Sequence, residues 1–168
     1  MPLGPPPYRV RLEYREASLP PGIRANIDTP VHSTVEQGLV VELAGWIACF
    51  SDADQTPPQS IVVSVGNFGW LEAPVQLKRP DVVTGQLEET GQKPISDRCG
   101  FSLLLPTHLV RAGGPYIVSV RLAGSNFLHE IAEVSFESLA SKPWHLATKV
   151  RPLILNSIGR TGSSLLCR

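Results

Sequence analysis

Short apolar runs separated by turn residues follow one another along most of the chain. The run at 39–49 is apolar and β-branched in its first half, as a buried strand should be. In the short segment 68–71, Phe68 and Trp70 share one face at a spacing of two. Together these runs predict strands over residues 39–49, 61–65, 68–71, 100–105, 116–122 and 127–136.

Strands that recur at intervals of about ten residues favour antiparallel β-structure over alternating strands and helices. We therefore predict a mainly β fold, an antiparallel, immunoglobulin-like β-sandwich over residues 8–138. A hairpin turn is expected at 124–126, and short helices are expected at 79–86, opened by Pro80, and at 107–111. Residues 1–7 are rich in proline and are expected to be disordered.

The pattern changes type in the last thirty or so residues. Residues 139–149 read as a linker, and 150–155 form a nearly continuous apolar run, typical of a strand that is covered on both faces. A loop containing two glycines follows, and Leu165-Leu166 suits the buried side of a helix that is just beginning. Residues 150–168 therefore predict the start of an α/β, P-loop-like domain.

The loop between this strand and helix has the residues of an anion site. Backbone N–H groups at a helix N-terminus, with the helix dipole, attract anions. Gly159 and Gly162 allow the backbone to approach a ligand closely, and Arg160 can donate forked hydrogen bonds to a phosphate or sulfonate. Hydroxyl donors are added by Thr161, Ser163 and Ser164. A connection that binds nothing remains the alternative.

Spacing excludes several other loops. A Walker A loop needs a lysine where Ser163 stands and a glycine where Ser157 stands. The G-x-S-x-G nucleophile elbow and the Rossmann G-x-G-x-x-G are absent, and no cysteine opens the loop as a phosphatase would require. A nucleotide kinase-like loop is therefore disfavoured by the missing lysine.

What remains resembles the 5′-phosphosulfate-binding loop of the sulfotransferases, in which an apolar strand leads into Arg–Ser/Thr–Gly–Ser–Ser/Thr and then Leu-Leu. The resemblance covers residues 150–168 and implies a donor, 3′-phosphoadenosine-5′-phosphosulfate, and no metal. The residues that it implies for donor binding are Arg160, Thr161, Gly162, Ser163 and Ser164. The family's catalytic base, 3′-phosphate site and acceptor pocket are not located by this sequence.

Three short motifs in the β region resemble a β-sandwich accessory module of bacterial glycosyltransferases and related sugar-modifying enzymes. They are Gly45-Trp46, Arg79-Pro80-Asp81-Val82 and Cys99-Gly100-Phe101. The resemblance implies acceptor recognition or an architectural role, without catalytic residues. From the residues alone, Trp46 is expected in the core, and a local salt bridge or helix cap accounts for Arg79 and Asp81.

Phe68 and Trp70 could stack a sugar ring, although core packing is the favoured interpretation for both. His32, His108, His129 and His145 are dispersed and show no metal-ligand spacing. Asp52, Asp54 and Asp97 are expected in loops, and the sequence alone does not pair any two of them as a general acid and a general base.

Charge and cysteine content limit the partners. The net charge is zero, which disfavours nucleic acid, yet residues 138–168 hold five basic residues and no acid. No apolar run is long enough to span a membrane. The three cysteines are an odd number without paired spacing, which indicates neither a disulfide framework nor a zinc site. A cytoplasmic protein is expected.

The sequence thus predicts the N-terminal portion of a sulfotransferase that sulfates a carbohydrate or similar hydroxyl acceptor. The chain ends at Arg168 before an α/β domain could close, so we expect it to be inactive alone. The alternative is a non-catalytic β-sandwich that binds carbohydrate or protein.

Overall fold

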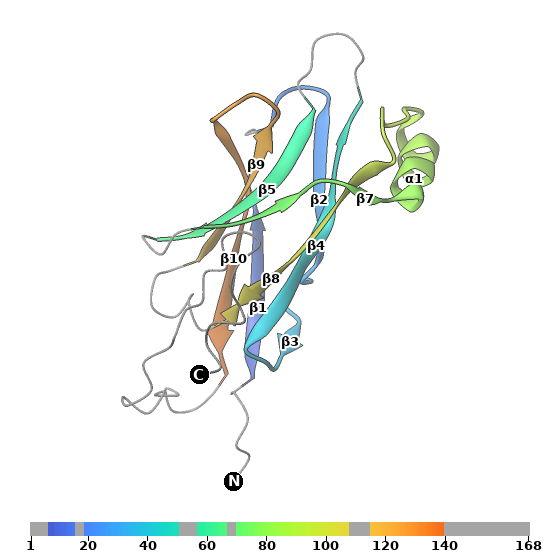
Figure 1. Ribbon diagram of the computed structural model, residues 1–168. Coiled ribbons are helices and arrows are strands. Elements are labelled where there is room, and N and C mark those ends of the chain that lie inside the picture. Colours follow the sequence, from blue (N-terminus) through green and yellow to red (C-terminus); the bar gives the residue numbers. More distant parts are fainter. Residues whose placement is uncertain (1–6, 16–18, 51–56, 67–69, 108–114, 140–168) are drawn as a thin grey trace, which may run out of the picture.

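The computed structural model describes residues 7–15, 19–50, 57–66, 70–107 and 115–139, and the predicted donor loop lies outside them. The described chain forms two antiparallel sheets and one helix (Figure 1). The six-stranded sheet has the order β3 (Val35–Glu36), β1 (Tyr8–Tyr14), β10 (Leu128–Ser138), β9 (Tyr116–Leu122), β5 (Pro58–Val65), β6 (Trp70–Pro74). The four-stranded sheet has the order β2 (Ile23–Thr29), β4 (Val40–Cys49), β8 (Arg98–Pro106), β7 (Leu77–Lys78). The mainly β, antiparallel prediction is confirmed.

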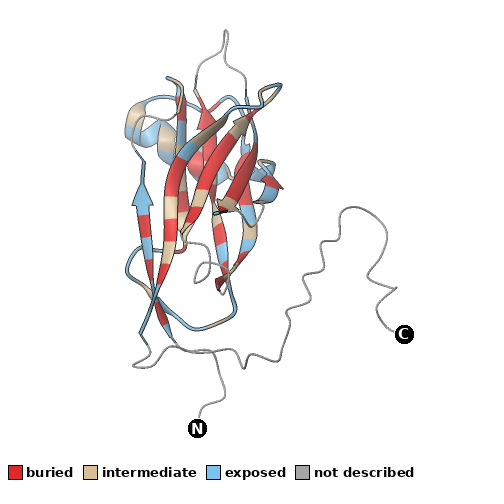
Figure 2. Ribbon diagram, turned by 90° about the vertical axis from the view of Figure 1, so that its left-hand side faces the viewer, coloured by how far each residue is buried: buried red, intermediate tan, exposed pale blue. Residues whose placement is uncertain are grey.

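One core lies between the two sheets, because alternate side chains of each strand point toward the other sheet. In β1, for example, Tyr8, Val10 and Leu12 are buried while the residues between them are exposed. Figure 2 shows the same concentration of buried positions along the central strands. The largest fully buried side chains come from both sheets and include Tyr8, Tyr116, Phe101, Leu43, Ile47 and Ile61.

The predicted strands are all present, with ends that differ by a few residues. The run at 68–71 becomes β6, which begins at Trp70, and the predicted turn at 124–126 does connect the antiparallel strands β9 and β10. Gly124 has φ 71°, and the Ser125 N–H donates to the Leu122 carbonyl at 3.1 Å, as a tight turn requires. Four strands were not predicted: β1, β2, β3 and β7.

The predicted helix at 79–86 is α1 (Pro80–Thr90), four residues longer at its C-terminal end. Pro80 begins it, because a first-turn residue needs no N–H donor, and Asp81 places a carboxylate at the positive end of the helix dipole. Gly91, with φ 69°, ends it by donating its N–H to the Leu87 carbonyl at 2.9 Å. The other predicted helix, at 107–111, lies almost wholly outside the described residues.

Tyr116, at the start of β9, fixes the end of β8. Its hydroxyl donates a 2.6 Å hydrogen bond to the Pro106 carbonyl, and burial raises the pKa of Tyr116 to about 12. We expect Tyr116→Phe to lower the free energy of unfolding at neutral pH by about 1 kcal/mol, because the carbonyl loses its donor.

The pH dependence follows from the raised pKa. Below pH 10 the tyrosine is protonated in both folded and unfolded chains, so its contribution is fully present. As the pH rises toward 12, the unfolded chain loses the phenol proton first and the contribution disappears. Urea denaturation of both proteins between pH 7 and pH 11 measures this. If the stability difference between the wild type and Tyr116→Phe grew with pH, the raised pKa assigned to Tyr116 would be contradicted.

Candidate functional site

None of the residues predicted to bind a ligand has a side chain within the described part of the chain. Arg160, Thr161, Gly162, Ser163 and Ser164 lie outside it, and so does Phe68. Trp70 is placed by its backbone as the first residue of β6, opposite Ser64 of β5, and its side chain is outside the described set. The donor loop and the stacking role therefore stay predictions.

The three motifs of the β region, far apart in sequence, meet on the outer face of the four-stranded sheet. Trp46 of β4 pairs directly with Gly100 of β8, and Gly45 pairs with Phe101. Arg79 leads from β7 into α1, and a Cβ on Gly100 would come within 2.7 Å of Arg79 Cγ. Gly100 is therefore the residue that lets the arginine stem lie on the sheet.

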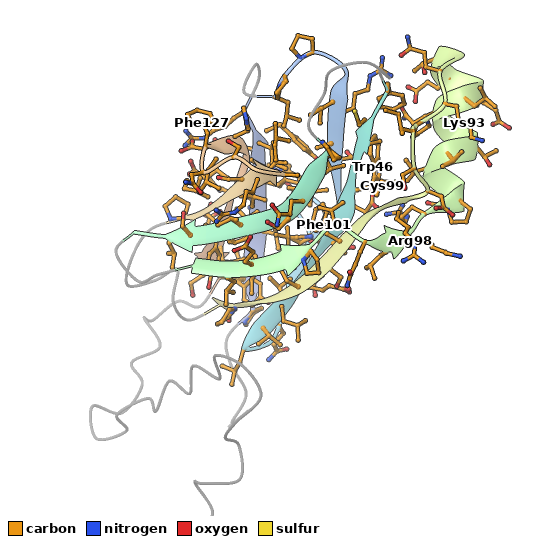
Figure 3. The ribbon with its side chains drawn as sticks, turned by 45° about the horizontal axis from the view of Figure 1, so that its top comes forward. Trp46, Lys93, Arg98, Cys99, Phe101 and Phe127 are labelled. Carbon is orange, nitrogen blue, oxygen red and sulfur yellow. The ribbon has the colours of Figure 1, made fainter. Side chains whose placement is uncertain are left out.

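Helix α1 is attached to the sheet at this point through a small apolar cluster. Val82 of α1 packs with Ala48 of β4 and Cys99 of β8, and Trp46 and Phe50 cover their edge. Figure 3 shows Trp46 and Cys99 next to one another on the side of the sheet that carries α1. The prediction that Trp46 lies in the core holds only in part, because it packs at this second cluster and is half-buried.

Arg79 joins the helix to the far edge of the sheet by ion pairs. Its Nη1 lies 2.7 Å from Asp28 Oδ2 of β2, and its Nη2 lies 2.7 Å from Asp81 Oδ2. Its Nε also donates to Asp81 Oδ1 at 2.9 Å. These hydrogen bonds lower the pKa of Asp81 and raise that of Arg79. The predicted local salt bridge between Arg79 and Asp81 is confirmed. Because Arg79 pairs with two carboxylates, we assign it a structural role.

Arg79→Ala is expected to lower the free energy of unfolding by about 1–3 kcal/mol. The variant leaves two carboxylates without their shared cation and removes the stem that covers Gly100. Chemical denaturation measures the loss. The matched control is Arg11→Ala, because the Arg11–Glu137 pair is exposed on both sides and should change stability by no more than about 1 kcal/mol. Equal losses in both variants would contradict the role given to Arg79.

Among the residues that the structure describes, the candidate titrating groups His32, Asp97, Cys99 and His129 each contact different parts of the fold. His32 lies with Nδ1 3.1 Å from the Leu12 backbone nitrogen, and the His129 ring contacts Phe127 edge-to-face at 4.8 Å. The Asp97 carbonyl accepts a hydrogen bond from the Arg79 N–H. Burial raises the pKa of the Cys99 thiol, which makes it a poor nucleophile. Asp52, Asp54, His108 and His145 lie outside the described residues.

The described residues form concave surfaces at two places that bear on function. One, of about 470 Å³, runs between the first half of α1 and the following loop, and its lining consists of Pro80, Val83, Thr84, Lys93, Pro94, Ile95, Ser96 and Asp97. The other, of about 410 Å³, lies at the β9–β10 turn and is lined by Gln59, Glu72, Arg121, Gly124, Ser125 and Asn126. We call the second the polar pocket. Sequence reasoning missed it, because its residues come from three separate segments.

Within the described ranges, no group of three or more histidine, cysteine, aspartate or glutamate side chains could hold a metal ion. The helix found in these ranges is too short and too polar to cross a bilayer. Comparison of the chain with protein-family models, curated proteins and solved structures gives no match.

Proposed function

We propose that this chain belongs to a sulfotransferase that uses 3′-phosphoadenosine-5′-phosphosulfate to sulfate a carbohydrate or similar hydroxyl group. The observation that carries the proposal is the stretch Arg160 to Leu166 after an apolar run, within a segment that holds five basic residues and no acid. Residues 8–138 are proposed to be an accessory module for acceptor recognition.

The accessory module is proposed to be immunoglobulin-like, and its strand order supports this. Immunoglobulin domains place strands A, B, E and D in one sheet and strands G, F, C and C′ in the other. In chain order, β2, β4, β5, β6, β7, β8, β9 and β10 correspond to A, B, C, C′, D, E, F and G. The six-stranded sheet contains two further strands, β1 and β3, which lie beyond β10 and have no counterpart in this assignment. The bond from Tyr116 to Pro106 also resembles the tyrosine corner at the start of strand F.

The module departs from antibody domains in its core. The antibody disulfide joins strands B and F, whereas β9, in the place of F, contains no cysteine that could form this bond with β4. The tryptophan of strand C is also missing, since β5 carries only aliphatic core residues. The immunoglobulin proposal therefore concerns the strand order and does not extend to these two core features.

In the proposed donor site, the residues of this chain bind and neutralise charge. Arg160 would hold an oxygen of the phosphosulfate, and the backbone and hydroxyl donors of 161–164 would surround the rest. Such donors stabilise the charge that develops on the leaving phosphate when the sulfonate is transferred. A metal is therefore not required by the proposal.

Isothermal titration calorimetry of the full-length protein tests the donor site. We expect adenosine 3′,5′-bisphosphate, the donor without its sulfonate, to bind in buffer containing EDTA. ATP with Mg²⁺ should bind more weakly, because the loop lacks the lysine of a nucleotide kinase. Preference for ATP with Mg²⁺, or binding of neither nucleotide, would contradict the proposal.

The second candidate is a non-catalytic module that binds carbohydrate or protein. The polar pocket favours the carbohydrate version, since it offers both donors and acceptors at one concave surface. Such a module would bind sugar whether or not the chain binds the donor, and the two properties are measured separately.

A further inference from the structure

The polar pocket lies on the face of the six-stranded sheet that points away from the core. Arg121 of β9 pairs with Ser60 of β5, while the neighbours of Arg121, Val120 and Leu122, point into the core. The side chains of Arg121 and Ser60 therefore stand on the outer face. The turn 124–126 closes one end of the pocket.

The centre of the pocket is an ion pair that is only partly satisfied. Arg121 Nε lies 3.1 Å from Glu72 Oε1, yet this buried atom makes no hydrogen bond of acceptable geometry. The same Glu72 oxygen accepts a hydrogen bond from the Ser60 hydroxyl, which holds the carboxylate in place. The Arg121 side chain is 20% exposed and is part of the pocket lining. A buried donor without a partner costs free energy that a ligand could recover.

Uncharged groups surround this pair. Among the described residues, the side-chain amides of Gln59 and Asn126 have no hydrogen-bond partner, and both residues line the pocket. The Ser125 hydroxyl already accepts from the Phe127 N–H and keeps its own proton to donate. The pocket thus presents a carboxylate, a guanidinium, two amides and a hydroxyl within one concave surface.

We propose that the polar pocket binds a neutral sugar ring of a glycan. Each sugar hydroxyl is both a donor and an acceptor, so neighbouring hydroxyls match a surface where carboxylate, guanidinium and amide groups alternate. The charges of Glu72 and Arg121 cancel, which removes the excess positive charge that an anionic ligand needs. A volume of about 410 Å³ is within the range of small-molecule sites.

This inference deepens the acceptor-recognition role and rests on that part of the proposed function. It does not depend on the donor loop. If the sugar titration described next fails while adenosine 3′,5′-bisphosphate binds, the pocket is wrong and the sulfotransferase proposal stands. If sugar binds and the nucleotide does not, the sugar site stands and the sulfotransferase proposal is contradicted.

The test is nuclear magnetic resonance titration of the ¹⁵N-labelled full chain with methyl glycosides of glucose, mannose, galactose and N-acetylglucosamine. Binding of at least one glycoside should shift the amide signals of Gly124, Ser125 and Asn126 and the side-chain amide of Gln59. Glu72→Gln and Asn126→Ala should each weaken that binding by about tenfold or more. No shift with any glycoside would overturn the proposal, and so would shifts caused only by inorganic sulfate.

The control for Glu72→Gln is Glu137→Gln, which makes the same change at another ion pair of the same sheet, on β10. It should leave sugar affinity unchanged. Asn126→Ala replaces an exposed turn residue and should not disturb folding, so it keeps the test decisive if Glu72→Gln is unstable. Wild-type affinity in both pocket variants would also overturn the proposal.

Discussion

Gly45→Ala is expected to lower the free energy of unfolding by about 3 kcal/mol or more, enough to threaten a domain of ordinary stability. A Cβ at this position would collide with the Asn26 carbonyl oxygen and would lie 3.0 Å from Ile27 Cα and Phe101 Cζ. Two of these atoms belong to the backbone of β2, which cannot move without breaking its pairing with β4. Chemical denaturation measures the loss.

Gly85→Ala is the matched control. A Cβ on Gly85 would meet no atom within 4 Å, and the residue lies inside α1. Since alanine is a better helix former than glycine, we expect this variant to gain about 0.5–1 kcal/mol. Wild-type stability in Gly45→Ala would show that β2 and β4 do not approach as closely as described.

Arg160→Ala is expected to weaken binding of adenosine 3′,5′-bisphosphate and of the donor by about 10- to 100-fold. A charged hydrogen bond contributes about 1.5–3 kcal/mol, and the variant removes the one forked donor of the proposed loop. Calorimetry of the full-length protein with each ligand measures the change.

Arg151→Ala makes the same substitution nine residues earlier, in the same acid-free segment. It lowers the net charge equally and should leave affinity within a factor of about two, because salt screens a charge that does not touch the ligand. If both variants lost the same affinity, Arg160 would act only through net charge, and the specific role of the loop would be refuted.

The sequence predicted the strands in which apolar residues are closely spaced, such as β4, β5 and β9, because a strand that is buried in a sheet consists mainly of such residues. It could also have predicted β1, where Tyr8, Val10 and Leu12 alternate with charged residues. In β2 the signal is weak, since Ile23 and Ile27 are its only large apolar residues.

The positions of the Arg79 contact and of the polar pocket could not be predicted from the sequence, for a different reason. Trp46, Arg79 and Gly100 converge only through the pairing of β4 with β8 and through the path of β7 into α1. Glu72 of β6 and Arg121 of β9 come together because their strands are the two neighbours of β5 in the sheet. Local patterning does not specify this strand order. The donor loop is the opposite case, since its chemistry is contained in consecutive residues.

Transfer of ³⁵S from labelled 3′-phosphoadenosine-5′-phosphosulfate tests the central claim most directly. The full-length protein would be incubated in EDTA with the donor and a panel of oligosaccharides and polysaccharides. We predict that ³⁵S appears in at least one saccharide fraction with the wild type, and that Arg160→Ala abolishes most of this transfer. If all of the label stays on the nucleotide for every saccharide in the panel, the claim that this chain belongs to a carbohydrate sulfotransferase is contradicted.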